Sequence, residues 1–109
     1  MIKIDTKDLQ ARIDWIAGIQ DGDGAGTTRL LYSPSWRKAQ EGLKERFLAI
    51  GMKAEYDEIG NLFGTVIGTE DPHQVIASGS HVDTVVNGGP LDGQFGIIAA
   101  HMAIEKLVE

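Results

Sequence analysis

The sequence contains no cysteine among its 109 residues. This absence excludes disulfides and thiolate metal ligands, so any metal site must be built from histidine and carboxylate side chains. Basic residues are also scarce, since 10 Lys and Arg stand against 16 Asp and Glu and give a formal net charge of -6 at pH 7. Binders of nucleic acid and proteins that dock on anionic membranes normally present a basic face. The charge balance therefore argues against both partners.

Long apolar runs are missing as well. No segment approaches the roughly 20 apolar residues of a membrane span. The N-terminal stretch MIKIDTKDLQ lacks the continuous apolar core of a signal peptide. We therefore expect a cytoplasmic protein. The hydrophobic fraction of 42% and the charged fraction of 24% are typical of a soluble globular domain, and the length suits one domain with one core.

Apolar residues at helical spacing predict two helices in the first half of the chain. The first runs from about Lys7 to Ala17, with Thr6 as its N-cap. Ser33 and Pro34 predict the start of the second, because serine is a good N-cap and proline is favoured at the first helical position. Gly51 predicts its end. The apolar stripe expected on the second helix comprises Trp36, Ala39, Leu43, Phe47 and Ile50.

The pattern then changes to the period of two that is typical of strands. Met52, Ala54 and Tyr56 alternate with charged residues, which predicts a strand with one covered face. The turn dipeptide GN follows, and the segment 62–68 (LFGTVIG) is expected to pair with that strand. The segment 75–80 (VIASGS) predicts a further short strand, of the kind that is buried on both faces of a sheet.

A third helix is expected from about Gln94 onward. It shows no glycine cap and no polar tail, which predicts that the chain is the beginning of a longer polypeptide. The order helix, helix, hairpin, strand, loop, helix predicts an α/β layered domain. The residues expected to point inward from this third helix are Ile97, Ile98, Met102, Ile104 and Leu107.

Several polar residues have competing interpretations. The loop at 21–26 (DGDGAG) resembles a calcium loop or a phosphate-binding loop, but Tyr32 stands where calcium needs a glutamate and no strand precedes the loop. A flexible surface loop is the preferred interpretation. Arg29 could hold an anionic substrate group or serve as an ordinary surface or ion-pair arginine. His73 is expected in solvent, and His101 is expected to pack within the last helix.

The strongest candidate site is the stretch GSHVDTVVNGGPLDGQFG at 79–96, which follows the predicted buried strand. His81 and Asp83 are two residues apart and lie on one face of an extended chain, so Asp83 could accept one imidazole N–H and leave the other nitrogen for a metal. The segment 87–90 lets the chain fold back and bring Asp92 toward His81. Alternatively, Asp92 caps the helix and His81 is a loop residue, with no metal involved.

Four stretches in the same order carry a resemblance to a known family. They are GTTRLLYSPSW from Gly26, DEIGNLFGTVIGTE from Asp57, SGSHVDTVVNGGPLDGQFG from Ser78, and the helix after it. They are similar to the M20 metallopeptidase family, in its branch of allantoate and N-carbamoyl-amino-acid amidohydrolases. The resemblance implies that residues 1–109 are the N-terminal portion of an α/β, three-layer αβα zinc-hydrolase catalytic domain. The rest of that domain and the dimerisation domain lie outside these residues.

The resemblance also implies roles at the matching positions. His81 would ligate one of two divalent ions, either zinc or manganese, and Asp92 would bridge both ions. Asp83 would act in catalysis by orienting His81. Arg29 and Gln94 are candidates for contact with the substrate. The family further implies a cis peptide bond between Asp92 and Gly93 when the native site is formed.

The implied activity is hydrolysis of a linear amide or ureido C–N bond by a homodimer with a small-molecule substrate. The first substrate expected is allantoate, giving ureidoglycine, ammonia and carbon dioxide; the alternative is an N-carbamoyl-L-amino acid, as in a β-ureidopropionase-like enzyme. The family's catalytic glutamate pair is absent from residues 1–109. The chain alone is therefore expected to be inactive and a weak metal binder. It is also expected to expose apolar faces at its truncated sheet and helix, and so to self-associate or to be only partly ordered. A non-enzyme alternative is a truncated protein that binds a partner through its exposed face.

Overall fold

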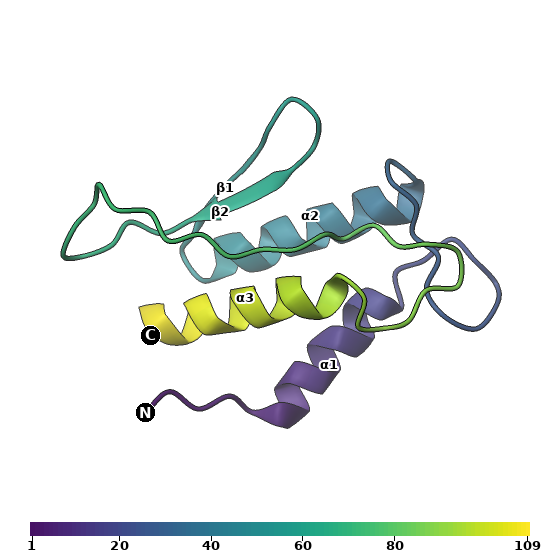
Figure 1. Cartoon of the computed structure of the whole chain (residues 1–109), viewed down its shortest axis with the longest axis horizontal. Coiled ribbons are helices and arrows are strands. Elements are labelled where there is room, and N and C mark those ends of the chain that lie inside the picture. Colours follow the sequence, from purple (N-terminus) through teal and green to yellow (C-terminus); the bar gives the residue numbers. More distant parts are fainter.

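The computed structural model describes residues 1–109 and combines three helices with one two-stranded antiparallel sheet. None of the helices combines the length and apolar character that a membrane crossing requires. Along the chain the elements are α1 (Thr6–Ala17), α2 (Pro34–Ala49), β1 (Lys53–Tyr56), β2 (Leu62–Thr65) and α3 (Gln94–Val108) (Figure 1).

Helix α1 begins one residue earlier than expected, because Asp5 and not Thr6 is its N-cap. One carboxylate oxygen of Asp5 accepts the N–H of Lys7 at 2.8 Å and that of Asp8 at 3.4 Å. Aspartate caps well because its side chain accepts free N–H groups while its charge complements the positive end of the helix dipole. The predicted cap at Thr6 is therefore wrong, although the predicted helix is confirmed.

Both predicted ends of α2 are confirmed. Ser33 has an extended backbone, and its hydroxyl accepts the N–H of Trp36 at 3.2 Å. Pro34 is the first helical residue, where its missing N–H leaves no bond unmade. At the other end Gly51 adopts a φ of 86° and donates its N–H to Leu48 O at 3.0 Å. A residue with a side chain would be strained at this left-handed φ, which explains why glycine ends the helix.

The predicted hairpin is present but shorter than expected. Strands β1 and β2 are antiparallel, with Lys53 opposite Thr65 and Tyr56 opposite Leu62. The carboxylate of Asp57 accepts N–H groups of the connecting turn, including that of Asn61 at 2.9 Å. The second strand ends at Thr65 and does not continue through residue 68.

The predicted strand at residues 75–80 is not formed. This segment has no ladder partner, and the side chains of Val75 and Ile76 are 86% and 98% exposed. An apolar β-rich run becomes a strand only when a neighbouring strand supplies N–H and C=O partners. The chain's two strands pair with each other, so nothing described here completes a ladder beside residues 75–80.

The core lies where α1 and α2 meet α3, and the two buried residues of α3 expected from its pattern, Ile98 and Met102, belong to it. Leu107 was expected to point inward but is 68% exposed. At about 100° per residue, Leu107 lies roughly 140° around the helix from Met102, so it faces away from the core. The buried apolar cluster consists of Ile13, Ile16, Ile19, Ala39, Leu43, Val82, Ile98 and Met102.

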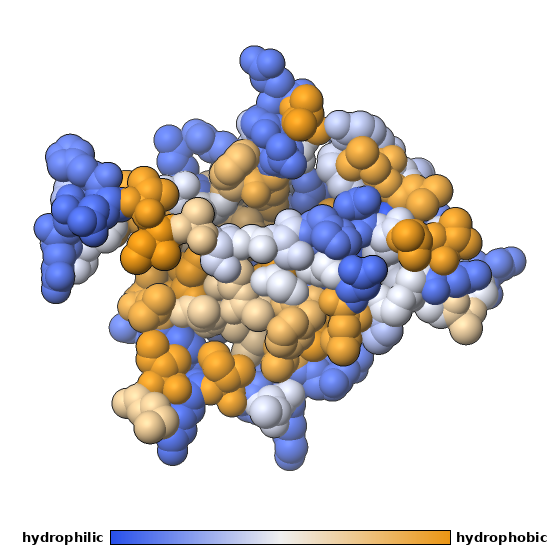
Figure 2. Space-filling view, in the orientation of Figure 1, coloured by the Kyte–Doolittle hydropathy of each residue, from blue (hydrophilic) through white to orange (hydrophobic).

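The molecule is flat, with extents of 47 × 35 × 19 Å. The shortest extent leaves room for only about two helix layers, since a helix with its side chains is roughly 10 Å across. Many apolar side chains consequently remain on the surface, and Figure 2 shows them as orange and tan areas across the middle of one face. The expected exposure of apolar faces is confirmed.

Candidate functional site

The His81 loop is fastened to a segment that precedes it by more than fifty residues. Thr27 and Gly88 exchange both backbone hydrogen bonds at 2.8 Å. The N–H of Thr84 donates to Arg29 O at 2.8 Å, and the Thr84 hydroxyl accepts the N–H of Arg29 at 2.8 Å. Residues 27–29 therefore form a support along which the loop runs. No periodicity in the sequence indicated this pairing.

Arg29 is fully buried, with 0% of its surface exposed. Its guanidinium donates to Val82 O at 2.9 Å, to Ile16 O at 2.7 Å, to Ile19 O at 2.6 Å and to the side-chain oxygen of Gln94. A buried cation requires such acceptors, and carbonyls at the C-terminal end of a helix carry partial negative charge. This position contradicts the predicted contact of Arg29 with a substrate, because its donors are directed into the protein.

Gln94 is equally buried, at 0% exposure. Its side-chain oxygen accepts from Arg29, and its amide nitrogen donates to Pro90 O at 3.0 Å and to Gly89 O at 3.4 Å. The predicted substrate contact of Gln94 is likewise contradicted by its burial. The amide binds the loop from within, at the first residue of α3.

His81 projects from the loop with its two ring nitrogens in different environments. Nδ1 lies 2.9 Å from the backbone oxygen of Asp83 and 3.5 Å from a carboxylate oxygen of the same residue. A carbonyl oxygen can only accept, so Nδ1 is the nitrogen that carries the hydrogen. Asp83 was expected to orient the imidazole through its carboxylate. In this structure the backbone oxygen of Asp83 lies closer to Nδ1 than its carboxylate does. In a neutral ring with this bond, the lone pair is on Nε2.

Asp92 lies on the other side of this imidazole. One of its carboxylate oxygens is 3.5 Å from His81 Nε2. The alternative in which Asp92 caps α3 is contradicted, since the helix N-terminus has no side-chain cap and Gly93 occupies the N-cap position. The side chains of His81, Asp83 and Asp92 are 52%, 46% and 71% exposed, so the three predicted residues come together at an open, solvent-accessible place.

The chain turns into α3 at Gly93 without a cis bond. All peptide bonds are trans, so the cis bond between Asp92 and Gly93 that was expected for the formed site is not present in this structure. Gly93 adopts a φ of 72° and provides the reversal by its backbone freedom instead. A trans bond also avoids the roughly 2.5–4 kcal/mol cost of a non-proline cis peptide.

The separation of His81 and Asp92 fits two ligands of one divalent ion. Two donor atoms that are each about 2.0–2.2 Å from a tetrahedral zinc ion lie roughly 3.4 Å apart, and His81 Nε2 is 3.5 Å from the Asp92 oxygen. Imidazole and carboxylate are suitable donors for zinc or manganese. Residues 1–109 contain no group of three such side chains arranged to hold a metal ion, and Asp83 lies beside the other ring nitrogen. The donor set therefore matches part of a metal site and not a complete one.

In the loop at 21–26, the carboxylate of Asp21 is bonded to the protein itself. The Asp21 carboxylate accepts the Ser35 hydroxyl at 2.6 Å and its N–H at 3.3 Å, and these bonds lower the pKa of Asp21. Asp21 thereby fastens the loop to the first turn of α2. The preferred interpretation as a surface loop agrees with this arrangement, although the loop is tied at one end.

The remaining histidines behave as expected. His73 is exposed to solvent. His101 is 5% exposed and stacks on Phe47 with ring centroids 5.5 Å apart. Its role is therefore packing between α2 and α3.

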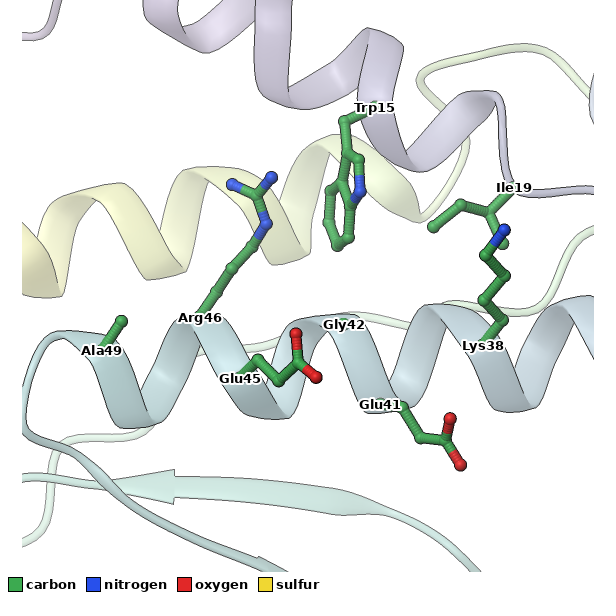
Figure 3. A pocket seen from close by; sticks show the side chains of 8 residues that line it. All are labelled: Trp15, Ile19, Lys38, Glu41, Gly42, Glu45, Arg46 and Ala49. Carbon is green, nitrogen blue, oxygen red and sulfur yellow. The ribbon is translucent and has the colours of Figure 1, made fainter.

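A groove between α1 and α2 has a volume of about 560 Å³. Figure 3 shows the Trp15 side chain extending from α1 toward α2, with the side chain of Arg46 beside it. The Arg46 guanidinium lies 3.8 Å from the centre of the Trp15 ring, which is cation–π geometry. None of the residues predicted for the site lines this groove, so it does not identify a catalytic centre.

Comparison with curated proteins identifies relatives along most of the chain. It is 48% identical over 99 residues to the allantoate amidohydrolase of Escherichia coli (strain K12), which covers 91% of this chain and 24% of that enzyme. It is 42% identical over 97 residues to the allantoate amidohydrolase of Bacillus subtilis (strain 168), covering 89% and 24%. The N-carbamoyl-L-amino-acid amidohydrolase of Paenarthrobacter aurescens is 38% identical over 87 residues, covering 80% and 21%. No family model matches the sequence.

Solved structures give the same result. AtUAH in complex with glyoxylate superposes with a TM-score of 0.91 at 31% identity, covering 97% of this chain and 25% of that chain. A hydantoinase/carbamoylase family amidase from Burkholderia ambifaria superposes with a TM-score of 0.89 at 28% identity, covering 97% and 26%. The predicted fold class is confirmed by these two likenesses.

The class that these likenesses define is that of the amidohydrolases. More particularly, the homologues of this chain are the allantoate amidohydrolases and the N-carbamoyl-L-amino-acid amidohydrolases, which confirms the resemblance seen in the sequence. The chain spans about a quarter of the length of the curated relatives it matches.

Proposed function

We propose that the polypeptide to which these residues belong, here called the complete polypeptide, is a metal-dependent amidohydrolase that cleaves allantoate to ureidoglycine, ammonia and carbon dioxide. The observation that carries this proposal is the His81–Asp92 pair. His81 Nε2 lies 3.5 Å from a carboxylate oxygen of Asp92, in a chain that is 48% identical to an allantoate amidohydrolase. The proposal includes a homodimer in the cytoplasm.

The chemistry proposed for the bound ions, two of zinc or manganese, is to polarise the scissile carbonyl and to lower the pKa of the attacking water. His81 would contribute Nε2 as a ligand, and Asp92 would contribute its carboxylate as the bridging ligand. Asp83 keeps the imidazole in the useful tautomer, since its carbonyl holds the Nδ1 hydrogen. The general base is assigned to a glutamate outside residues 1–109, because the family's glutamate pair has no counterpart here.

A second substrate class has direct support. The chain is 38% identical to an N-carbamoyl-L-amino-acid amidohydrolase and 35% identical to the ureidoglycolate hydrolase of Oryza sativa subsp. japonica. All three substrates named by these relatives join a ureido group to a carboxylate-bearing carbon. The allantoate assignment therefore depends on the higher identity to the allantoate amidohydrolases.

The first prediction concerns substrate and metal together. The complete polypeptide should hydrolyse allantoate faster than N-carbamoyl amino acids or ureidoglycolate, lose this activity on chelation and regain it with zinc or manganese. Ammonia release from each substrate measures the outcome. His81→Ala and Asp92→Asn should lower kcat/KM by at least about a hundredfold, because each removes a proposed metal ligand.

Three results would overturn the proposal. Full activity in a thoroughly chelated, metal-free enzyme would show that hydrolysis does not need a metal. A preference for N-carbamoyl amino acids would assign the enzyme to the alternative substrate class. Absence of hydrolysis on all three substrates, together with capture of a protein partner, would favour the non-catalytic alternative.

A further inference from the structure

Arg29 is a fully buried charge with no carboxylate among its hydrogen-bond partners. The acceptors are the carbonyls of Ile16, Ile19 and Val82 and the side-chain oxygen of Gln94. Burying a cation is costly unless the surrounding groups compensate it. Part of the compensation comes from the C-terminal end of α1, where the carbonyl dipoles point at the guanidinium. Burial lowers the pKa of Arg29, and the negative charge of Asp83 acts in the opposite direction.

The acceptors of Arg29 lie on both flanks of the His81–Asp92 pair. Val82, whose carbonyl accepts from Nε at 2.9 Å, is the residue directly after His81. Gln94, which accepts from Nη2, follows Asp92 by two positions and is the first residue of α3. One planar guanidinium therefore hydrogen-bonds both to the residue that follows His81 and to the first residue of the helix that follows Asp92.

Gln94 extends this connection to the returning part of the loop. Its amide nitrogen donates to Pro90 O at 3.0 Å and to Gly89 O at 3.4 Å. The segment that places Asp92 is thus held from inside the protein, while the Asp92 side chain itself has no capping bond. These bonds add to the backbone pairing of residues 27–29 with the loop, and together they hold the segments that carry the imidazole and the carboxylate.

We propose that Arg29 and Gln94, the Arg29–Gln94 clamp, are positioning residues that set the separation of His81 Nε2 and Asp92 for metal binding. That a metal binds at this site rests on the proposed function. The hydrogen bonds of the clamp are observed between residues 29, 82, 90 and 94 and do not depend on a metal. Both side chains act through other groups, since neither reaches the surface of the site.

The clamp requires the shape of the guanidinium as well as its charge. Arginine presents five N–H donors in a fixed plane, and here they reach acceptors in α1, in the loop and in α3. Lysine keeps the charge but has one flexible ammonium, which cannot reach all of these acceptors at once. Arg29→Lys should therefore preserve the charge and still loosen the loop.

The test compares clamp variants with a core variant in the complete polypeptide. The clamp variants are Arg29→Lys and Gln94→Met, where methionine keeps the side-chain length and removes both polar atoms. The control is Leu43→Ala, which opens the same core without touching a bond to the loop. Zinc affinity is measured by competition with a chromogenic chelator at a temperature where circular dichroism shows every variant folded.

We expect both clamp variants to bind zinc about tenfold more weakly, the lower end of what outer partners of metal ligands contribute. The control should bind zinc as the parent protein does, even if it loses as much thermal stability. If Gln94→Met and Leu43→Ala change the zinc affinity equally at equal loss of stability, Arg29 and Gln94 are ordinary packing residues and the proposal is overturned. Arg29→Lys need not fold for this comparison, because Gln94→Met alone decides it.

A readout without metal separates this inference from the proposed function. Selective ¹⁵N labelling of histidine reports the tautomer of the His81 ring in chelated protein. The parent and Leu43→Ala should show the hydrogen on Nδ1, and Gln94→Met should show a mixture of tautomers. If the parent protein binds no zinc, the proposed function fails. The ¹⁵N chemical shifts of the His81 ring still test whether Arg29 and Gln94 position the imidazole. Identical ring shifts in all variants would refute this positioning.

Discussion

At the scale of single residues, the His81 imidazole is the group with the most defined chemistry. Its Nδ1 hydrogen is held by the Asp83 carbonyl at 2.9 Å, and Nε2 faces Asp92. A ligand whose tautomer is already fixed loses less entropy when it binds a metal, because the ring need not be reoriented. The same ring lies directly against Gly93, which makes that glycine a sensitive position.

We predict that Gly93→Ala displaces the imidazole. A Cβ at position 93 would lie 2.5 Å from His81 Nδ1 and 2.6 Å from Nε2, and the φ of 72° adds strain of about 1–2 kcal/mol for a residue with a side chain. Zinc affinity of the complete polypeptide should fall by at least about tenfold. Titration with a zinc chelator, together with thermal unfolding, measures both effects.

Gly89→Ala is the matched control for this prediction. It makes the same substitution in the same loop, where an added Cβ meets no atom within 4 Å. Its zinc affinity and unfolding temperature should remain close to those of the parent. Equal losses in the two variants would mean that the loop is sensitive to alanine in general, and the specific contact with His81 would then be refuted.

At the scale of elements, α1 and α3 are joined by a charged group around Arg12. Its guanidinium donates to Asp8 at 2.9 Å, to Glu105 at 2.8 Å and to His101 Nδ1 at 3.2 Å. These bonds hold the pKa values of Asp8 and Glu105 below their ordinary range. The other His101 nitrogen donates to Arg46 O at 3.2 Å. His101 is therefore neutral, with its hydrogen on Nε2.

Acidification should weaken this junction through His101. Burial lowers the pKa of His101 below its ordinary value of 6.5, and the charge of Arg12 also lowers it. The unfolded chain then takes up the proton first, so the free energy of unfolding is constant above pH 6.5 and falls as the pH decreases through that value. The slope for one group is at most about 1.4 kcal/mol per pH unit.

His101→Gln should abolish this part of the pH dependence, because glutamine keeps polar contacts and does not titrate. Denaturant unfolding of both proteins at pH 7.5 and 5.5 measures the difference. Asp8 and Glu105 do not contribute to the change between pH 7.5 and 5.5, because their pKa values are lowered. Their contribution to the free energy of unfolding is lost only at lower pH, as they become protonated. A variant that loses as much stability as the parent between these two pH values would contradict the assignment.

Elements determined by local chemistry could be predicted from the sequence. Ser33, Pro34 and Gly51 delimit α2 through their own backbone preferences, and the hairpin turn contains its own signal. The segment at 75–80 could not be predicted in the same way, because a strand depends on a distant partner. The close approach of His81 and Asp92 was predictable since both lie in one loop.

Long-range contacts account for the failures at the site. Arg29 looks like a surface cation in the sequence, and only its pairing with residues 82–84 shows why it is buried. Gln94 lies in an apolar helix start and gives no polar pattern. The trans bond before Gly93 depends on backbone angles that composition does not specify.

At the scale of the whole molecule, the chain covers about 24% of the length of the allantoate amidohydrolases it matches. The flat shape and the exposed side chains of Val75, Ile76 and Leu107 describe a structure with large uncovered apolar areas. Such areas favour association. We predict that residues 1–109 alone self-associate and do not hydrolyse allantoate, and light scattering with an ammonia assay measures both properties. A monodisperse monomer would contradict the first and turnover the second.

The central claim is that His81 and Asp92 bind a catalytic metal ion, and anomalous diffraction at the zinc edge tests it most directly. Crystals of the active complete polypeptide grown with zinc should show an anomalous peak about 2.0–2.2 Å from both His81 Nε2 and an Asp92 oxygen. A peak at other residues, or none beside His81 in an enzyme that still hydrolyses allantoate, would contradict the account.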